Sequence, residues 1–324
     1  MKLWSRLLNL SYLPNTESRD IVKILLTGGG GFIGSHVVDL LLNEKHQVVV
    51  VDDFSSGKVE NISKGAACYS INMNDTNLEN VFLAENPDIV IHLAEQVSVT
   101  KSMDNPLSDC VQTINGTINL LECCIKYKVK KIIYSSSAAV YGKPTYVPID
   151  ENHVLAPKSF YGLSKLTGEA YVQLYSKLYN LNYTILRYAN VYGPRQSNIG
   201  EAGVIRRFLD SFMLNQPLTV YGDGNQRRDF VYVKDVAEAT LQAIHHGDYE
   251  TFNISSNTTK SINDLIFLLS LFMDTKPEII HLPEPLGDIR ISCLSNEKAN
   301  KLLHWQPKIT LIEGIEETIL SLQS

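Results

Sequence analysis

The stretch Thr27–Gly34, Thr-Gly-Gly-Gly-Gly-Phe-Ile-Gly, decides the fold of this chain. It follows an apolar run over residues 21–26 and opens a segment with helical character over residues 35–42. In the pattern Gly28-x-x-Gly31-x-x-Gly34, the first glycine allows a tight turn, the second lets the backbone approach a diphosphate, and the third lets the helix pack against its strand. The amides at the helix N-terminus then hold the phosphate charge. A strand, a turn and a helix in this order predict a dinucleotide-binding site.

A second apolar run, Val48–Val51, predicts a buried strand that ends at Asp52 and Asp53. A carboxylate about twenty residues after the glycine turn accepts hydrogen bonds from the ribose diol of NAD, and it repels the 2′-phosphate of NADP. We therefore predict NAD as the cofactor and Asp52 as the residue that binds its ribose.

Strand-like and helix-like segments alternate between residues 21 and 187. The pattern predicts strands at 21–26, 47–51, 66–71, 88–93, 130–135 and 183–187, and helices at 34–44, 76–85, 108–127 and 159–179. Such alternation is typical of an α/β fold, a Rossmann-type doubly wound parallel sheet with helices on both faces. After about residue 188, Gly and Pro become frequent and the alternation ends. This change indicates a smaller C-terminal α/β domain for the substrate.

The pattern divides the chain into an N-terminal extension at 1–20, an NAD-binding domain at 21–187 and a substrate domain at 188–324, with part of 229–251 returning to the NAD-binding domain. The extension carries Leu and Trp side chains between basic ones. It is too short to span a membrane and lacks a small-residue cleavage site. We expect a short helix or a tail packed on the body, with a membrane-surface or subunit contact as the alternative.

The composition narrows the function classes. Hydrophobic residues make up 44% of the 324 residues, enough for one large core or two unequal ones, and the net charge is −6. A chain without a basic field is not expected to bind nucleic acid. The five cysteines and eight histidines show no metal-ligand spacing, so no metal site is predicted. An odd cysteine count without a secretory leader indicates reduced thiols and a cytoplasmic protein, and Cys123 and Cys124 are expected to pack in the core of a helix.

Tyr161 and Lys165 stand one helical turn apart on the same face of a predicted helix. An exposed pair of side chains is the simplest explanation of this spacing alone. A free tyrosine has a pKa near 10, so it is a poor base at neutral pH. A lysine ammonium and a positive nicotinamide beside it favour the phenolate, which can take a proton from a substrate hydroxyl while hydride leaves for NAD. Together with the glycine turn, the pair predicts hydride chemistry.

Further motifs occur in an order and spacing that identify a family. They are His92-Leu93-Ala94 with Gln96, Ser102 and Pro106; Gly116–Glu122; Ser135–Gly142; Tyr161-x-x-x-Lys165; Leu186–Arg195; and Gly222–Phe230. From Thr27 nearly to the C-terminus, the chain resembles the extended short-chain dehydrogenases/reductases, and among them most of all the UDP-hexose 4-epimerases. The resemblance implies a homodimeric enzyme that retains NAD, acts on a UDP-sugar and serves polysaccharide biosynthesis.

The resemblance also implies roles for individual residues. Tyr161 is the catalytic base, Lys165 is its partner, and the Ser137 hydroxyl acts on the same sugar oxygen. The residues implied to bind the cofactor are Gly28, Gly31, Phe32, Ile33, Gly34, Asp52, Asn72, Met73, Leu93, Ala94, Tyr161, Lys165 and Tyr188. Those implied to bind the substrate are Ser137, Tyr161, Asn190, Val204, Arg228, Asp288 and Ser292, with Arg228 on the diphosphate. His92, at the end of its strand, is expected to be structural.

Two alanines distinguish between the reactions of this family. After the catalytic serine or threonine, the related 4,6-dehydratases carry an acidic pair and the UDP-glucuronate decarboxylases usually carry a Glu at the second place, and here these places are Ala138 and Ala139. Methyl groups move no proton, so the pattern favours C4 epimerisation through a 4-keto sugar that turns over about its link to the diphosphate.

Other activities stay open at this point. A UDP-glucuronate 4-epimerase is the first alternative, although such enzymes tend to carry Thr where Asn190 stands. A dehydratase or a decarboxylase is another. A non-catalytic NAD-binding sensor or scaffold is a different class of protein, which usually loses the Tyr or the Lys.

Several residues depart from the family pattern. Asn72 replaces an acidic residue on the adenine side, and Glu95 stands near the cofactor where alanine is usual. Pro285 replaces an arginine that contacts the nucleotide, and this contact is lost unless Arg290 supplies it. Ser292 takes the place of a residue that borders the C2 substituent of the sugar, where a bulky aromatic admits only a hydroxyl. The small serine predicts UDP-N-acetylglucosamine as a substrate beside UDP-glucose.

Overall fold

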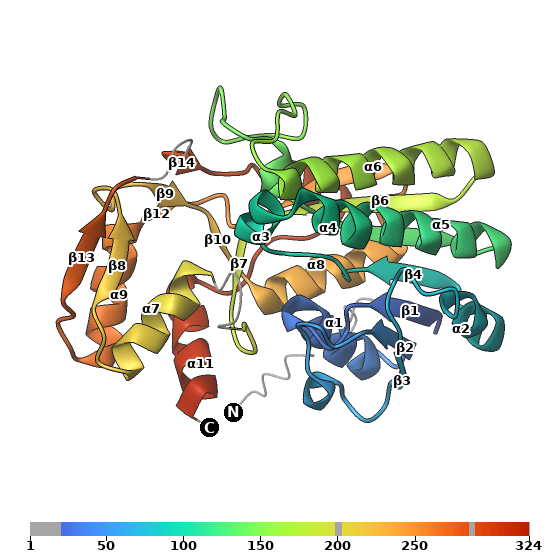
Figure 1. The fold of residues 1–324 in the computed structure, drawn as a ribbon, viewed down its shortest axis with the longest axis horizontal. Coiled ribbons are helices and arrows are strands. Elements are labelled where there is room, and N and C mark those ends of the chain that lie inside the picture. Colours follow the sequence, from blue (N-terminus) through green and yellow to red (C-terminus); the bar gives the residue numbers. More distant parts are fainter. Residues whose placement is uncertain (1–20, 198–202, 285–288, 324) are drawn as a thin grey trace, which may run out of the picture.

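The computed structural model describes residues 21–197, 203–284 and 289–323. A seven-stranded parallel sheet, covered by helices, is the centre of the larger part of the molecule (Figure 1). The order reverses between β1 and β4, the point at which doubly wound sheets bind ligands beyond the carboxyl ends of their strands. The predicted doubly wound fold is confirmed, and every pairing in the sheet is parallel. In space the strands are β11 (Glu250–Ile254), β6 (Asn182–Tyr188), β5 (Lys131–Ser137), β4 (Ile89–His92), β1 (Lys23–Thr27), β2 (Gln47–Asp52) and β3 (Ala67–Ser70).

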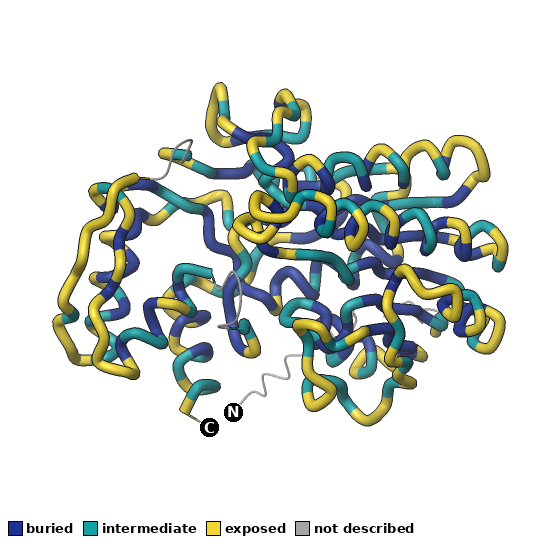
Figure 2. The backbone as a smooth tube through the Cα atoms, in the orientation of Figure 1, coloured by how far each residue is buried: buried dark blue, intermediate teal, exposed yellow. Residues whose placement is uncertain are grey.

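Helices cover both faces of this sheet. Along β1, Ile24 and Leu26 belong to one core and Leu25 to the other, because successive side chains of a strand point to opposite faces. Burial on both faces explains why the inner strands β1, β2 and β4 are nearly unbroken apolar runs, and Figure 2 shows the inner part of the sheet as the buried centre of the molecule. The first core includes α1 (Phe32–Asn43) and α8 (Val233–His245), and the second includes α2 (Leu78–Glu85), α5 (Gly116–Lys126) and α6 (Phe160–Tyr179).

The six predicted strands match β1 to β6 within two residues at each end. The predicted helix at 108–127 is instead divided into α4 (Pro106–Cys110), a π-helical turn (Val111–Asn115) and α5. A single wider turn hardly changes the apolar spacing of a short segment, so the sequence pattern did not show it. A further short helix, α3 (Val99–Asp104), was not predicted. Short 3₁₀ turns occur at Val59–Asn61 and Ala138–Val140.

A smaller part of the molecule has its own apolar core, which includes Phe208, Leu209 and Leu265. β11 and α8 come from the second half of the chain, but β11 is a strand of the large sheet and α8 packs in its core, so the chain returns to the larger part. The domain boundary at residues 187 and 188 stays a prediction. The remaining elements are β7 (Asn190–Tyr192), α7 (Val204–Met213), β8 (Leu218–Tyr221), β9 (Arg227–Arg228), β10 (Phe230–Tyr232), β12 (Lys260–Ser261), α9 (Ile262–Met273), β13 (Ile279–Leu282), β14 (Ile291–Ser292), α10 (Glu297–Leu302) and α11 (Leu311–Gln323).

The structure bears on the predictions made for the cysteines and for a membrane-spanning segment. All five cysteines are free, and Cys123 and Cys124 are buried in α5, as predicted. Within the described ranges, no helix combines the length and the apolar character that crossing a membrane requires. The N-terminal extension at 1–20 lies outside the described residues, so its predicted conformation stays a prediction.

Candidate active site

The glycine turn joins β1 to α1 at the carboxyl end of the sheet. Gly28 has a φ of +76°, and a Cβ on it would lie 2.7 Å from the amide nitrogen of Ala94. A Cβ on Gly34 would lie 2.0 Å from the carbonyl oxygen of Gly28. Side chains are therefore excluded at both positions. The backbone at the start of α1 forms a cradle that fits the diphosphate of a dinucleotide.

Asp52, at the end of β2, holds the glycine turn. Its Oδ2 accepts a hydrogen bond from the Gly30 amide at 2.8 Å, and its Oδ1 accepts one from the Phe54 amide at 2.8 Å. Burial raises the pKa of this carboxyl above its usual value. A ribose contact was predicted for Asp52, whereas its hydrogen bond to the Gly30 amide of the turn was not. Asp52 also lines the active-site pocket, so the ribose contact stays a prediction.

Tyr161 and Lys165 lie on the first turns of α6, a helix capped by Ser159. The Tyr161 amide donates a hydrogen bond to Ser102 Oγ at 3.0 Å, which fixes the start of the helix. Lys165 Nζ lies 5.8 Å from the centre of the Tyr161 ring and donates to the Ser135 carbonyl at 2.6 Å. Since Lys165 is only 1% exposed, the two residues are not an exposed helix pair.

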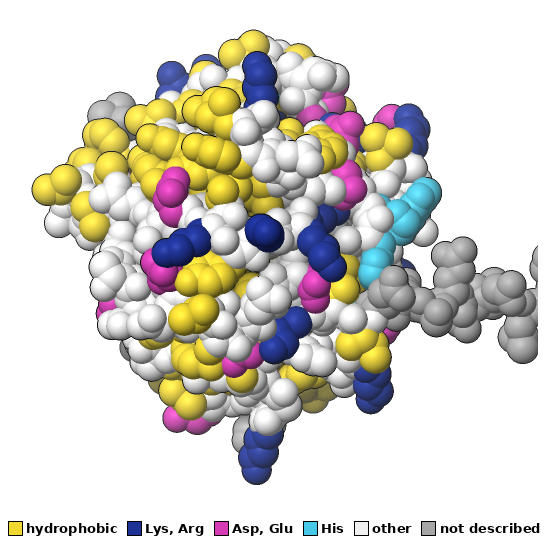
Figure 3. All heavy atoms as spheres, turned by 90° about the vertical axis from the view of Figure 1, so that its right-hand side faces the viewer, with side chains coloured by type: hydrophobic (Ala, Val, Ile, Leu, Met, Phe, Trp, Pro, Cys, Tyr) yellow, Lys and Arg dark blue, Asp and Glu magenta, His cyan; other side chains and the backbone are white. Residues whose placement is uncertain are grey.

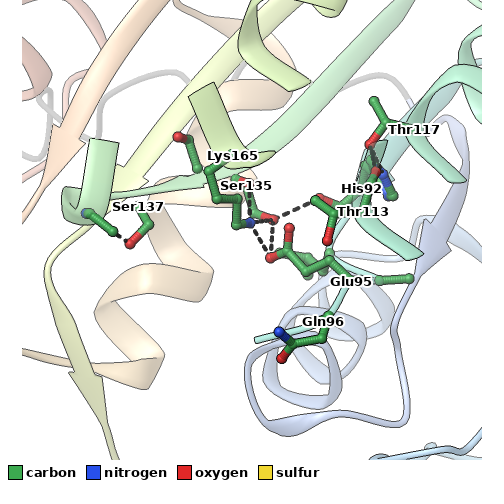
Figure 4. A network of polar contacts seen from close by, with 12 residues as sticks. His92, Glu95, Gln96, Thr113, Thr117, Ser135, Ser137 and Lys165 are labelled. Carbon is green, nitrogen blue, oxygen red and sulfur yellow. Dashed lines mark hydrogen bonds and ion pairs between the residues drawn. The ribbon is translucent and has the colours of Figure 1, made fainter. Parts of the chain in front are cut away.

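Glu95 forms an ion pair with Lys165 inside the site (Figure 4). The Ser135 hydroxyl lies 3.4 Å from the same carboxylate. The Glu95 side chain is 8% exposed, and burial raises the pKa of its carboxyl while Lys165 opposes that shift. Burial likewise lowers the pKa of Lys165, and Glu95 opposes it. Glu95, which the sequence showed only as a departure from the family pattern, thus supplies a counter-ion to the buried ammonium.

His92, at the end of β4, is held as a neutral ring. Thr117 donates its hydroxyl proton to the Thr113 carbonyl at 2.6 Å, so its oxygen accepts from His92 Nε2 at 3.0 Å. His92 Nδ1 then accepts from the Thr27 hydroxyl at 2.8 Å. Burial lowers the pKa of His92 to about 3, with a further contribution from Lys165. The histidine ties β1, β4 and α5 together and is structural, as predicted.

One pocket of about 420 Å³ brings most of the predicted residues together. Gln112, Ser135 and Glu95 line it as well, although no role was predicted for any of them. Two of them were visible in the sequence as departures from the family pattern: Glu95 as an acidic residue beside a cofactor motif, and Gln112 as a glutamine where asparagine is usual. The predicted residues that line the pocket are Gly28, Gly31, Phe32, Ile33, Gly34, Asp52, Asn72, Met73, Leu93, Ala94, Ser137, Tyr161, Lys165, Tyr188, Asn190 and Val204.

Arg228 and Ser292 lie together but are not among the residues that line this pocket. They face each other in the pairing of β9 with β14, and Arg228 Nη1 donates to the Ile289 carbonyl at 2.6 Å. Arg290, the possible substitute for the missing arginine, binds the Asp223 carboxylate at 2.7 Å through each of two nitrogens. The substrate contacts of Arg228 and Ser292 therefore stay predictions.

Two further predictions concern the substrate contact of Asp288 and the absence of a metal site. Asp288 and Pro285 lie outside the described residues, so the contact predicted for Asp288 stays a prediction. Among the residues that the structure does describe, there is no group of three or more His, Cys, Asp or Glu side chains that could hold a metal ion.

The sheet and the pocket define a class of protein. A doubly wound sheet whose glycine turn opens into the same pocket as a tyrosine and a buried lysine is that of a short-chain dehydrogenase/reductase. The chain belongs to the NAD dependent epimerase/dehydratase family, whose sequence model matches residues 24–255. The predictions of an enzyme and of NAD as its cofactor are thereby confirmed.

Known relatives extend over almost the whole chain. A putative UDP-glucose 4-epimerase of Methanocaldococcus jannaschii is 43% identical over 297 residues, which cover 91% of this chain and 97% of that protein. The crystal structure of UDP-glucose 4-epimerase with UDP-glucose from Thermotoga maritima is 42% identical with a TM-score of 0.91, covering 93% of this chain and 98% of that one. UDP-N-acetylglucosamine 4-epimerase from Methanobrevibacter ruminantium M1, in complex with UDP-N-acetylmuramic acid, is 32% identical with a TM-score of 0.89, covering 94% and 98%. These relatives confirm the resemblance to UDP-sugar 4-epimerases.

Proposed function

We propose that this chain is a 4-epimerase of UDP-hexoses, with UDP-N-acetylglucosamine and UDP-glucose as substrates. The observation that carries the proposal is the single pocket in which the glycine turn meets Ser137, Tyr161 and Lys165. The names of the relatives from Thermotoga maritima and Methanobrevibacter ruminantium support one substrate each.

Tyr161 is the base in this proposal. The ammonium of Lys165, 5.8 Å from the ring centre and shielded from solvent, favours the phenolate over the phenol. The phenolate takes the proton of the C4 hydroxyl and returns it at the end of the reaction. NAD, held by the glycine turn, supplies the hydride chemistry at C4.

Ser137 positions the sugar oxygen. It ends β5, and its Oγ accepts a hydrogen bond from the Ala139 amide at 3.2 Å. Because the oxygen is used as an acceptor, the hydroxyl proton remains for donation to the C4 oxygen. Ser137 therefore stabilises the charge that passes between the sugar and Tyr161.

Ala138 and Ala139 favour epimerisation over elimination of water. These residues follow Ser137 in the 3₁₀ turn and carry no acid or base. The 4-keto sugar thus keeps its other substituents and turns over about its link to the diphosphate, so that its other face is presented for reduction at C4. Asn190 and Val204, which line the same pocket, supply contacts to the substrate in this proposal.

Incubation with a panel of nucleotide sugars tests the proposal. UDP-glucose, UDP-N-acetylglucosamine and UDP-glucuronate are each added to the purified protein, and inversion at C4 is followed by NMR. We expect C4 epimers of the first two sugars. A 4-keto-6-deoxy product or a pentose would instead support a dehydratase or a decarboxylase, and turnover of UDP-glucuronate alone would support its 4-epimerase.

Tyr161→Phe is the matching variant. It is expected to keep the fold and the bound NAD while turnover falls by a factor on the order of a hundred or more. Tyr179→Phe, at the other end of α6 and 53% exposed, is the control and is expected to keep full turnover. Full activity of Tyr161→Phe would remove Tyr161 from the mechanism.

We also infer that the chain is a cytoplasmic protein. We infer further that it forms a homodimer through an apolar surface of α3, α4 and α6. These helices pack against one another, and they expose Met103, Leu107, Leu163 and Leu178. Figure 3 shows hydrophobic side chains gathered on the upper part of the end of the molecule where α5 and α6 finish. Light scattering after gel filtration is expected to give twice the mass of the chain, and Leu107→Glu with Leu178→Glu is expected to give monomers.

A further inference from the structure

Glu95 has no role in the proposed mechanism, although it contacts Lys165 directly. We propose that Glu95 is a positioning residue that sets the pH range of catalysis by neutralising the charge of Lys165. This inference rests on the proposed function, in which Lys165 favours the phenolate of Tyr161.

The geometry isolates the pair from water. Lys165 Nζ lies between the carbonyl of Ser135, at 2.6 Å, and the carboxylate of Glu95 (Figure 4). The Lys165 side chain is 1% exposed and that of Glu95 is 8% exposed. Solvent and salt screen such a pair poorly, so a single charge acts strongly on its neighbours.

Other acidic groups around Lys165 are committed to their own partners. Glu169, on α6, pairs with Arg187. Asp109, on α4, accepts from Ser164 Oγ at 2.6 Å and from Gln96 Nε2 at 3.0 Å. The remaining titratable groups near the pair are neutral at neutral pH or are the proposed base itself: His92 on β4, Tyr134 on β5, Tyr188 on β6 and Tyr161 on α6. Glu95 is therefore the acidic group whose charge is directed at Lys165.

A negative charge at Glu95 acts in the same direction on both catalytic groups. It raises the pKa of Lys165, because the ammonium has a counter-ion, and it disfavours the phenolate of Tyr161, because that would be a second negative charge in the same pocket. Activity requires the Tyr161 phenolate and the Lys165 ammonium together. The acid limb of the pH profile then reports Tyr161, and the alkaline limb reports Lys165.

Glu95→Gln, which keeps the shape and removes the charge, tests the inference. We expect both limbs of the pH profile of kcat to move to lower pH, each by about one unit. The ultraviolet absorbance of the Tyr161 phenolate, obtained by subtracting the titration of Tyr161→Phe, is expected to appear at lower pH by the same amount. Glu95→Asp retains the charge and is expected to keep the parent profile. Glu316→Gln, on the exposed side of α11, is the control for removal of one charge anywhere on the chain.

The outcomes for Glu95 and for Tyr161 can be distinguished. A profile that is unmoved in Glu95→Gln, or moved to higher pH, overturns the inference about Glu95. If the glutamine variant does not fold, Glu95→Ala gives the same two measurements without requiring the pocket to hold an amide. Loss of turnover in Tyr161→Phe together with an unmoved Glu95→Gln profile would leave the proposed function standing, whereas full activity of Tyr161→Phe would remove its basis.

Discussion

Arg187 on β6 binds Glu169 on α6 through two hydrogen bonds, from Nη2 to Oε2 at 2.6 Å and from Nε to Oε1 at 2.9 Å. Both side chains are buried, and Arg187 Nη1 also donates to the Tyr141 hydroxyl at 2.9 Å. The pair joins the helix that carries Tyr161 and Lys165 to the sheet. The geometry of the proposed catalytic residues therefore depends on an ion pair that does not itself line the pocket.

Arg187→Met is expected to destabilise the chain strongly, because it leaves the Glu169 carboxylate buried without its partner. The free energy of unfolding in urea should fall by about 3–5 kcal/mol. The double variant Arg187→Met with Glu169→Leu removes both charges and should recover much of this loss. A single variant as stable as the parent would show that the pair does not hold α6 on the sheet.

His92 is expected to make stability depend on pH. The folded chain lowers the pKa of His92 to about 3 from the usual 6.5, so the unfolded chain binds the proton first as the pH falls. Stability from this group is complete above pH 6.5 and declines below it by about 1.4 kcal/mol per pH unit. His92→Gln should remove this slope, so that between pH 6.5 and 4.5 the free energy of unfolding in urea should fall by about 2 kcal/mol more in the parent than in the variant. His304→Gln, at an exposed position, should keep the parent slope, and equal slopes in the parent and His92→Gln would contradict the neutral buried ring.

Asp52 is expected to act on both the cofactor and the glycine turn. The purified protein should contain NAD(H), and Asp52→Ala should accept NADP more readily because the carboxylate no longer repels the 2′-phosphate. The same change leaves the amides of Gly30 and Phe54 without their acceptor and should cost about 1–3 kcal/mol of stability. Chromatography of the released nucleotide and thermal unfolding measure the two effects. Asp52→Asn, which keeps an acceptor and loses the charge, separates them, and NADP bound to the parent protein would contradict the prediction.

Ser292 is expected to admit an N-acetyl group. It lies on β14 opposite Arg228, the residue predicted to bind the diphosphate. Ser292→Tyr should block UDP-N-acetylglucosamine by steric overlap while turnover of UDP-glucose is retained, since overlap is penalised more steeply than a missing contact. Ser292→Ala is the control and should keep both activities in the NMR assay. Equal loss on both substrates, or no activity of the parent on UDP-N-acetylglucosamine, would place the gate elsewhere.

Six of the seven strands of the large sheet were predicted, and the inner ones were predictable because a strand buried on both faces is an apolar run, as Val48–Val51 illustrates. The edge strand β11 was not predicted, since Phe252 and Ile254 are its only apolar residues. The smaller part was less predictable for a physical reason. β9, β12 and β14 have two residues each, too few to show an alternation of side chains. The placement of Arg228 opposite Ser292 depends on the pairing of two such strands, so no local sequence pattern predicts it.

The sequence by itself determined the parallel sheet, the glycine turn at Gly28, the dinucleotide class of cofactor and the Tyr161–Lys165 spacing. Each of these depends on residues that are close together in the chain, where turn geometry and helical periodicity act directly. Only the tertiary structure decided that Lys165 contacts Glu95 and that Asp52 binds the Gly30 amide of the turn. Those partners come from separate segments, and they are brought together because a charge or an amide buried in a pocket with little water must find a partner wherever the fold places one.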